Sequence, residues 1–270
     1  MCVIYACQTI MPPDEELRRG SETNEDGAGI SWLDPDGSKI HWKKDLADWK
    51  GVLKFIKEEK LKLPYAIHFR SASVGGKSVG LAHPFPIAKG APLWVEGTGP
   101  SVLHHNGHLS DWSELVMKAG LASKEEFPLG PWSDSRGLAW LVHLKGEGIL
   151  PFIVGQSRVL MMSVEPNTYD GEEYNRAEDH FTYYGTGWIH KKDGWSQSVD
   201  TYDRWSRTPG RWNYVDPRAK DDDTETAVTK PTCSTTSTAC SPYIWTVEDL
   251  TTLLAELQEG QKNAKLATGA

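Results

Sequence analysis

The chain has 270 residues, of which 39% are hydrophobic and 24% are charged, and its formal net charge is −8. This length suffices for a large core without disulfides or metals, twelve tryptophans argue against intrinsic disorder, and the acidic balance disfavours a nucleic-acid or anionic-membrane partner. Four cysteines are too few for a disulfide framework, so a reducing, cytoplasmic setting is expected.

The N-terminal part of the chain alternates predicted strands with one predicted helix. Strands are expected at residues 1–10, 28–33, 39–43 and from 64 to about 70. In the last of these strands, period two places Tyr65, Ile67 and Phe69 on one face and the intervening residues on the other. Residues 45–60 predict an amphipathic helix, because apolar side chains recur there at helical spacing.

The middle of the chain adds two predicted helices and further strands. A strand at 102–105 precedes a helix that Ser110 is expected to cap and Gly120 to end, and a second helix is expected from Ser133 to about Gly146. Further strands are expected at 158–164, 181–184 and 187–190. The elements follow without strict βαβ alternation, which favours an α+β layered fold over a doubly wound one.

The composition changes at about Pro217. An acidic run at 221–225 and a Ser/Thr-rich run at 232–241 predict a polar segment of low complexity, and the residues after Thr246 predict a last amphipathic helix. We therefore expect a main domain at 1–205, a polar and partly flexible linker at 206–245, and a docking helix at 246–265.

Several apparent signals fail on spacing or context. Residues 76–78 (Gly-Lys-Ser) resemble the end of a phosphate-binding loop, but Ser71 stands where the earlier glycine is required. The histidines at 104, 105 and 108 lack the spacing of a helical zinc motif, and Cys233 and Cys240 lack close-set ligand partners. We therefore expect no metal and no cofactor. No apolar run approaches the ~20 residues that span a bilayer, so no membrane segment is expected.

Five short blocks carry residues suited to catalysis or binding, and each also has an ordinary structural explanation. Cys2 is also expected if the residue is simply buried in the core, and Asn106–Gly107 is also typical of a hairpin turn. Residues 133–135 are also typical of a helix cap. A glycine-rich hairpin entry explains residues 24–30, and an edge strand with one exposed arginine explains residues 68–73. The order of the blocks along one chain is therefore more informative than any single block.

Taken in order, the blocks resemble the class II glutamine amidotransferase domain of the N-terminal-nucleophile hydrolases, in particular its stand-alone type. That family has an N-terminal Cys, then Asp-Gly-x-Gly-Ile, His-x-Arg-x-[Ala/Ser]-[Ser/Thr], Ala-His-Pro-Phe, His-Asn-Gly and Ser-Asp-[Ser/Thr]. The matching residues here are Cys2, Asp26, Gly27, Gly29, Ile30, His68, Arg70, Ala72, Ser73, Ala82, His83, Pro84, Phe85, His105, Asn106, Gly107, Ser133, Asp134 and Ser135. The resemblance implies a four-layer αββα sandwich and a class II glutaminase-like catalytic domain over residues 1–205.

The resemblance makes Cys2 the nucleophile. Met1 precedes a small residue, so its removal by an aminopeptidase would leave Cys2 with a free α-amine, whose reference pKa is roughly 7.7–8.0. That amine can accept the thiol proton near neutral pH. The thiolate would attack the side-chain amide of glutamine, release ammonia and leave a γ-glutamyl thioester for hydrolysis.

The other roles also follow from the resemblance. The Asn106 side-chain amide and the Gly107 N–H would stabilise the oxyanion, each worth roughly 3–4 kcal/mol where such donors have been removed. Arg70 would bind the α-carboxylate of the substrate as a bidentate partner, and Asp134 would bind its α-ammonium. The remaining substrate-binding positions are Ser73, which would add a hydrogen bond, and His83, which would shape the pocket wall.

Two positions depart from the family pattern, and the chain length limits the function. Val3 stands where many members have Gly, and Arg136 where many have Glu, so an altered pocket shape and specificity are expected. The residues after 205 are too few for a synthase domain. We expect a glutaminase that supplies ammonia to a separate synthase subunit; the alternative is a stand-alone hydrolase of γ-glutamyl amides or peptides. A catalytically silent binding module is the least favoured reading.

Overall fold

A computed structural model describes residues 2–123, 125–165, 179–198, 205–208 and 211–214. The chain divides into two compact units, Met1–Pro217 and Arg218–Ala270. The predicted docking helix at 246–265 and most of the predicted linker lie outside the described residues. Within the predicted linker range, two short strands pair with each other, β12 (Trp205–Thr208) and β13 (Arg211–Tyr214).

Besides this two-stranded pair, the described residues of the first unit form two antiparallel sheets. The seven-stranded sheet has the order β10 (Trp188–Lys191), β11 (Trp195–Ser198), β1 (Val3–Cys7), β4 (Tyr65–Phe69), β2 (Ala28–Leu33), β3 (Ile40–Lys43) and β6 (Glu96–Gly99). The four-stranded sheet has the order β5 (Phe85–Pro86), β7 (Ser101–Asn106), β8 (Arg158–Ser163) and β9 (Phe181–Tyr184). The N-terminal strand β1 therefore lies inside a sheet, between β4 and β11.

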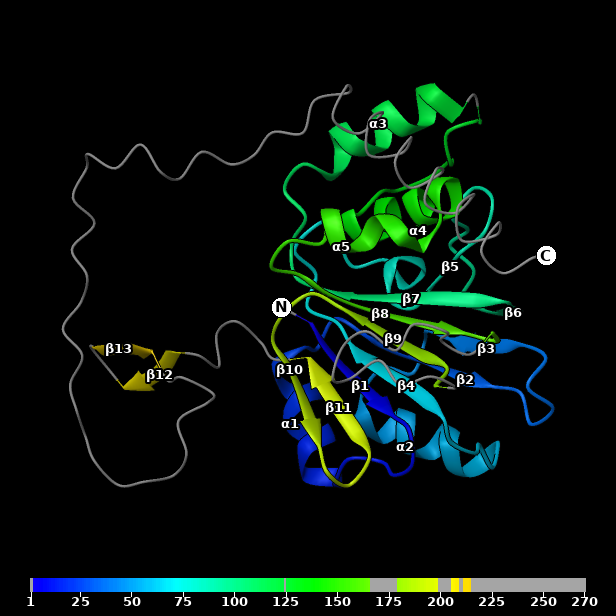
Figure 1. The fold of residues 1–270 in the computed structure, drawn as a ribbon. Coiled ribbons are helices and arrows are strands. Elements are labelled where there is room, and N and C mark those ends of the chain that lie inside the picture. Colours follow the sequence, from blue (N-terminus) through cyan, green and yellow to red (C-terminus); the bar gives the residue numbers. More distant parts are fainter. Residues whose placement is uncertain (1, 124, 166–178, 199–204, 209–210, 215–270) are drawn as a thin grey trace, which may run out of the picture. The chain divides into compact units, whose positions relative to one another are not determined.

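Five α-helices lie within the described ranges: α1 (Asp14–Thr23), α2 (Trp49–Glu58), α3 (Trp112–Ser123), α4 (Asp134–Lys145) and α5 (Leu150–Ile153). Figure 1 shows α1 and α2 beside the seven-stranded sheet, and α3, α4 and α5 on the side of the four-stranded sheet. None of these helices combines the length and apolarity that a membrane crossing needs. The mixed α/β composition with antiparallel sheets agrees with the expected α+β class.

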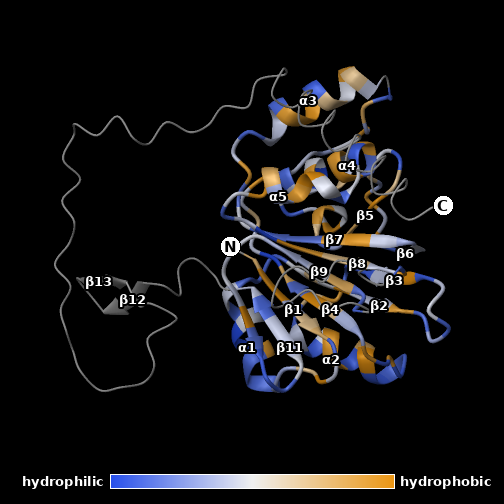
Figure 2. Ribbon diagram, viewed as in Figure 1, coloured by the Kyte–Doolittle hydropathy of each residue, from blue (hydrophilic) through white to orange (hydrophobic). Residues whose placement is uncertain are grey.

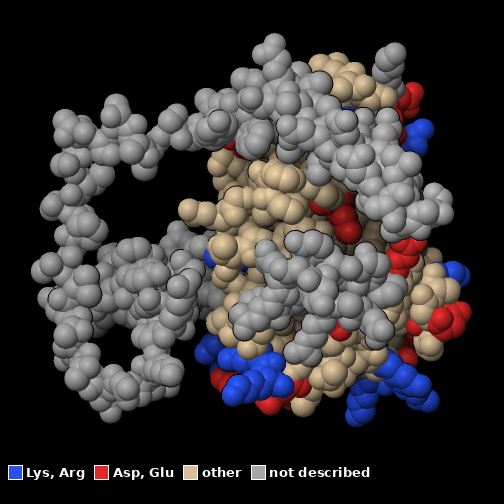
Figure 3. Space-filling view, in the orientation of Figure 1, with Lys and Arg blue, Asp and Glu red and all other residues tan. Residues whose placement is uncertain are grey.

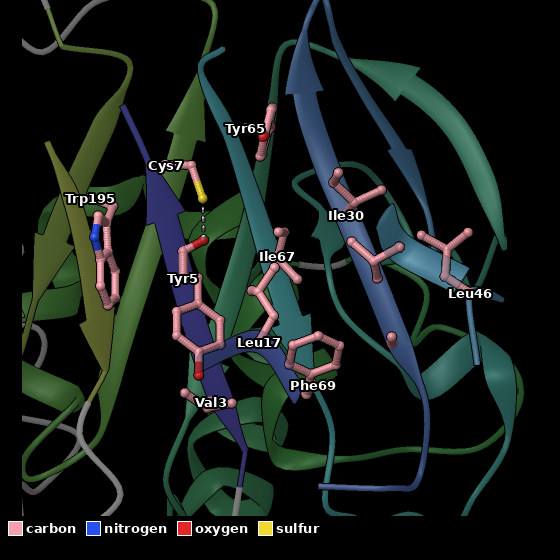
Figure 4. Packing of buried hydrophobic residues seen from close by; sticks show 12 residues of the cluster. Val3, Tyr5, Cys7, Leu17, Ile30, Leu46, Tyr65, Ile67, Phe69 and Trp195 are labelled. Atoms are coloured by element: carbon pink, nitrogen blue, oxygen red, sulfur yellow. Dashed lines mark hydrogen bonds between the residues drawn. The ribbon is translucent and has the colours of Figure 1, made fainter. Parts of the chain in front are cut away.

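The alternation expected from the sequence divides the side chains of the central strands between two apolar clusters, one on each face of the seven-stranded sheet. Tyr65, Ile67 and Phe69 of β4 pack into a cluster with Leu17 of α1 and Val52 of α2. This cluster also takes alternate residues of β1, and Figure 4 shows how its side chains point away from one face of the sheet. The period-two prediction for this strand is confirmed.

The opposite face of the seven-stranded sheet packs on the four-stranded sheet. Ile4 and Ala66 contribute to a second cluster together with Val102 and Leu160 from the other sheet. A third cluster joins the far face of the four-stranded sheet to α4 and α5, for example through Leu138. Figure 2 shows orange, hydrophobic segments in strands of both sheets and in the helices beside them. Burial of apolar surface between these elements stabilises the fold.

Helix α2 begins later than its apolar periodicity suggests. Ala47 has a φ of 57°, which an α-helix does not allow, so the helix cannot include Ala47 or extend back to Leu46, whose N–H donates to the Ala28 carbonyl at 3.2 Å. Asp48 is the N-cap, and its side chain accepts the Gly51 N–H at 2.9 Å. A tertiary hydrogen bond thus overrides the local pattern at this end.

The prediction that Gly120 ends a helix is wrong, because α3 continues through it to Ser123. A Cβ at position 120 would lie 2.6 Å from ring atoms of both Phe127 and Trp140. The glycine therefore permits a close approach between α3 and aromatic side chains, including one from α4. Its small size, and not its conformational freedom, explains the residue here.

Helix α1 was not expected from the sequence. Its interior has few apolar residues, and only Leu17, Gly20 and Ser21 are buried. Arg18 forms ion pairs of 2.6 Å with both Glu15 and Glu22 on the exposed side. Figure 3 shows basic side chains gathered with acidic ones over this end of the molecule, so no uniformly basic face appears in that view.

Candidate active site

One pocket collects most of the residues singled out from the sequence. Its empty space, with the open solvent at its mouth included, measures about 280 Å³. It is lined by Cys2, Arg70, Ser71, Ala72, Ser73, Val74, Leu81, His83, His105, Gly107, Ser133, Asp134 and Ser135. These residues come from the position before β1, the loop after β4, the segment before β5, the end of β7 and the start of α4. The pocket thus forms where five separate stretches of sequence meet.

Cys2 directly precedes β1 and is partly exposed. Its Sγ donates to the Ser71 carbonyl at 3.6 Å. Burial raises the pKa of the Cys2 thiol to about 11. The thiol is therefore protonated at neutral pH and needs a base before it can act as a nucleophile.

Arg70 directly follows β4, and its backbone is held on both sides. Its N–H donates to the Gly27 carbonyl at 2.9 Å, and its carbonyl accepts the Asp26 N–H at 2.9 Å. One guanidinium nitrogen, Nη2, donates to the Gly76 carbonyl at 2.7 Å. The other, Nη1, is buried and has no hydrogen-bond partner among the described residues. Although burial lowers the pKa of Arg70, an arginine stays charged, so Nη1 is available to an anion.

The loop after Arg70 is anchored by Asp26. Its Oδ2 accepts the Ala72 N–H at 2.8 Å, and its Oδ1 pairs with Lys77 Nζ at 2.5 Å. The hydrogen bond from Lys77 lowers the pKa of Asp26. Ser73, in the same loop, lines the pocket. The Asp-Gly block therefore supports the pocket wall from outside.

Asp134 opens helix α4 and is almost fully buried. Ser133 caps the helix, as expected from the sequence, because its side chain accepts the Arg136 N–H at 3.1 Å. The Asp134 carboxylate accepts the Leu109 N–H at 3.3 Å, and His108 Nδ1 lies 3.6 Å from the same oxygen. A carboxylate at a helix N-terminus is stabilised there by the helix dipole.

Asn106 and Gly107 end strand β7. Asn106 is fully buried and is not among the residues that line the pocket; its Nδ2 donates to Ser198 Oγ at 3.0 Å. Gly107 lines the pocket with a φ of 145°, a conformation that favours glycine. A Cβ there would also collide with Ser157, with its Cα at 2.8 Å. The backbone path at this corner therefore requires glycine.

His83 lines the pocket and belongs to a buried group of four histidines, with His68, His104 and His105. Its ring centroid is 3.9 Å from that of His68, and neither of its ring nitrogens has a hydrogen-bond partner in the described part of the chain. His68 Nε2 contacts the His105 carbonyl at 3.2 Å, and His104 Nε2 contacts Ser31 Oγ at 2.9 Å. Burial lowers the pKa of all four histidines, so the group is neutral at neutral pH.

The structure also places residues in the pocket to which the sequence assigned no role. His105 Nδ1 forms a 2.9 Å hydrogen bond with Ser135 Oγ, and both residues line the pocket. Both also belong to blocks recognised in the sequence, His-Asn-Gly and Ser-Asp-Ser. Their membership in those blocks was the available signal, but only the fold shows that the two side chains meet.

Arg136 does not line the pocket, and its side chain holds the loop that leads into α4. Its guanidinium donates to the carbonyls of Ala91, Pro131, Gly90 and Leu129 at 2.8–3.2 Å. It also lies over the Trp132 ring, 5.0 Å from the centroid. Arg136, which stands where the family pattern often has Glu, is thus a buried clamp that holds backbone carbonyls beside the site.

We expect Arg136→Ala to lower the free energy of unfolding by about 3–5 kcal/mol, since four carbonyls lose charged donors in a buried place. Urea unfolding monitored by tryptophan fluorescence measures this change. Arg19→Ala, which removes an exposed ion pair with Glu16, is the matched control and should change little. Equal effects of the two substitutions would contradict the clamp.

Comparisons with known proteins add little to this geometry. No family model matches the sequence, and no curated protein matches it. Among solved structures, the chain is similar to one titled as the structure of the allosteric regulatory enzyme of purine biosynthesis, with 21% identity and a TM-score of 0.42. The match covers 62% of this chain and 38% of that chain. A likeness this distant bears on neither activity nor substrate.

Proposed function

We propose that this chain hydrolyses the side-chain amide of glutamine through an N-terminal cysteine nucleophile. The observation that carries the proposal is that Cys2, Arg70, Gly107 and Asp134 line one pocket. The Cys2 thiol suits attack on the side-chain amide of an amino acid, and the Gly107 N–H suits the oxyanion that forms there. Arg70 and Asp134 suit the α-carboxylate and the α-ammonium of the same molecule. The chemistry therefore rests on the site and not on any similar protein.

The charges in the pocket suit a zwitterionic substrate. Arg70 has a guanidinium nitrogen without a protein partner, which suits the α-carboxylate. Asp134 supplies the carboxylate for the α-ammonium, and Ser73 can add a hydrogen bond. His83, kept neutral by burial, forms part of the wall without adding charge. No cofactor is needed for this reaction.

The reaction begins with removal of Met1, which gives Cys2 a free α-amine. The amine takes the thiol proton, and Sγ attacks the amide carbon to form a tetrahedral oxyanion. The carbon–nitrogen bond then breaks, ammonia leaves with a proton from the α-ammonium, and a γ-glutamyl thioester remains. Water, deprotonated by the same amine, hydrolyses the thioester, releases glutamate and restores the thiol. The raised pKa of Cys2 supports the need for such a base.

Stabilisation of the oxyanion is assigned to the side-chain amide of Asn106 and the backbone N–H of Gly107. Gly107 lines the pocket, and Asn106 immediately precedes it at the end of β7. An amide N–H pair of this kind stabilises developing negative charge without reorganising during the reaction.

We assign the first unit to the N-terminal-nucleophile type, as a four-layer αββα sandwich with the catalytic domain at 1–205. Three apolar clusters support this assignment, because each lies between a different pair of element groups. The proposal extends to a polar linker at 206–245 and a docking helix at 246–265. A separate, cytoplasmic synthase subunit would receive the ammonia.

Hydrolysis of two substrates tests the proposal and its alternative. Intact mass first confirms that Met1 is absent. Glutamate release from glutamine, which also yields ammonia, and from a γ-glutamyl dipeptide, which instead yields the free second amino acid, then gives the preference. Glutamine turnover supports the proposed function, whereas turnover of γ-glutamyl peptides with little glutamine hydrolysis supports the stand-alone γ-glutamyl hydrolase. No turnover of either substrate by the processed chain, alone or with a synthase, would contradict both.

Substitutions at Arg70 and Asn106 should separate substrate binding, measured by KM, from the chemical step, measured by kcat. Arg70→Ala should raise KM about 10–100-fold with a smaller change in kcat, because a charged contact with the ground state is lost. Asn106→Ala should lower kcat about 10²–10³-fold, because its amide acts on the oxyanion. Steady-state kinetics with glutamine checks both; the reverse pattern would refute the two role assignments.

A further inference from the structure

Ser198 connects the two strands that carry the proposed chemistry. It ends strand β11 and is fully buried. Its Oγ accepts the Ile4 N–H at 2.8 Å and the Asn106 Nδ2–H at 3.0 Å. The residue is 194 positions from Ile4 and 92 positions from Asn106 in the sequence, so the contact is made only by the fold.

The sheet register explains why this hydroxyl meets strand β1. Tyr5 pairs with Gln197 in the antiparallel ladder, so the next residues, Ile4 and Ser198, stand opposite each other. There the Ile4 N–H bonds to the Ser198 side chain. Ile4 is two residues from Cys2, so the hydroxyl is tied to the strand that bears the proposed nucleophile.

We propose that Ser198 is a positioning residue that orients the Asn106 amide for the oxyanion, an inference that rests on the proposed function. The amide nitrogen carries two hydrogens, and one of them is held by Ser198. The second hydrogen is then left with a fixed direction. Asn106 Oδ1 has no hydrogen-bond partner in the described ranges, so Ser198 alone holds this amide among those residues.

Loss of the hydroxyl should free the amide to rotate. The terminal torsion of asparagine is broad, so without a partner the N–H direction is no longer set by the side chain itself. The Asn106 N–H that acts on the oxyanion in the proposed reaction would then have the required direction for only part of the time. The effect should fall on kcat, since the oxyanion forms only during the reaction.

Kinetics of three serine variants tests this role. Ser198→Ala should lower kcat about tenfold and leave KM within about twofold, while Ser198→Thr, which keeps a hydroxyl, should recover most of the loss. Ser196→Ala is the matched control, because Ser196 is buried on the same strand but bonds His190 at 2.7 Å. It should retain wild-type kcat.

A spectroscopic measurement separates positioning from mere stability. In ¹⁵N-asparagine-labelled protein, the Asn106 side-chain signals are identified by their loss in Asn106→Asp. Ser198→Ala should shift these signals and speed the exchange of one amide hydrogen with water, whereas Ser196→Ala should not. Unchanged Asn106 signals, or a Ser198→Ala kcat equal to that of an active wild type, would overturn the role of Ser198. An inactive, processed wild type would instead refute the proposed function.

Discussion

Cys2→Ala is expected to lower the kcat for glutamine hydrolysis by at least about 10⁴-fold, because the variant lacks the sulfur that forms the thioester in the proposed mechanism. The fold should persist, since Cys2 is partly exposed and makes one weak hydrogen bond, to the Ser71 carbonyl. Ammonia release measures the loss, and circular dichroism confirms the fold. Residual activity near that of the wild type would show that the nucleophile is another group.

A control for this substitution lies on the same strand. Cys7 is fully buried in the apolar cluster against α1 and α2, and burial raises the pKa of its thiol. Cys7→Ala should cost some stability, about 1–2 kcal/mol, but leave kcat unchanged. The comparison separates the loss of a thiol from the loss of the nucleophile. Cys2→Ser should also be nearly inactive, because a serine hydroxyl is far less readily deprotonated than a thiol.

Stability should fall steeply in mild acid because of the four buried histidines. Burial lowers the pKa of His68, His83, His104 and His105 in the folded protein, to about 3 for His104. In the unfolded chain their pKa is near 6.5, so below that pH the unfolded state binds more protons and is favoured. Each such histidine lowers the free energy of unfolding by about 1.4 kcal/mol per pH unit between pH 6.5 and its folded pKa.

His104, whose folded pKa is about 3, should alone remove about 2 kcal/mol between pH 6.5 and pH 5, and the other three histidines should add to this loss. Urea unfolding at a series of pH values measures the slope. His104→Gln keeps a polar partner for Ser31 but cannot titrate, so it should make the slope shallower by the contribution of one histidine. A free energy of unfolding that stays constant from pH 7 to pH 5 would rule out the buried neutral group.

Local patterns in the sequence predicted the elements whose ends are set by their own residues. Helix α4 begins at the Ser133 cap and ends at Gly146, where a φ of 82° suits glycine. Strand β2 has the bounds expected from its composition and from the turn after it, in which the Gly37 N–H donates to the Asp34 carbonyl at 2.8 Å. In these cases the signal and its structural cause lie within a few residues of each other.

Distant contacts set the features that the sequence did not predict. The start of α2 depends on a hydrogen bond to the carbonyl of Ala28, and Gly120 is explained by aromatic rings from elsewhere in the chain. Strand β11 is only four residues long and carries two serines, so its sequence gives little signal for a strand. It is a strand because β1 and β10 lie on either side of it.

The candidate site shows the same division. Family-like blocks singled out Cys2, Arg70 and Asp134, and the fold places all three in one pocket. The blocks do not indicate that Asn106 lies beside Ser198, because the two residues belong to different sheets. Supporting contacts of this kind require the tertiary structure.

The position of β1 inside its sheet has a consequence for how the protein matures in the cell. Tyr5 pairs with Ile67 on one side and Gln197 on the other, and at a synthesis rate of about 5–20 residues per second its second partner emerges roughly 10–40 s later. During that interval the start of the chain is still unpaired at one edge and open to a processing aminopeptidase. In the proposed mechanism, trimming of Met1 would thus precede completion of the sheet, and a recombinant form that tests this mechanism should carry its affinity tag at the C-terminus.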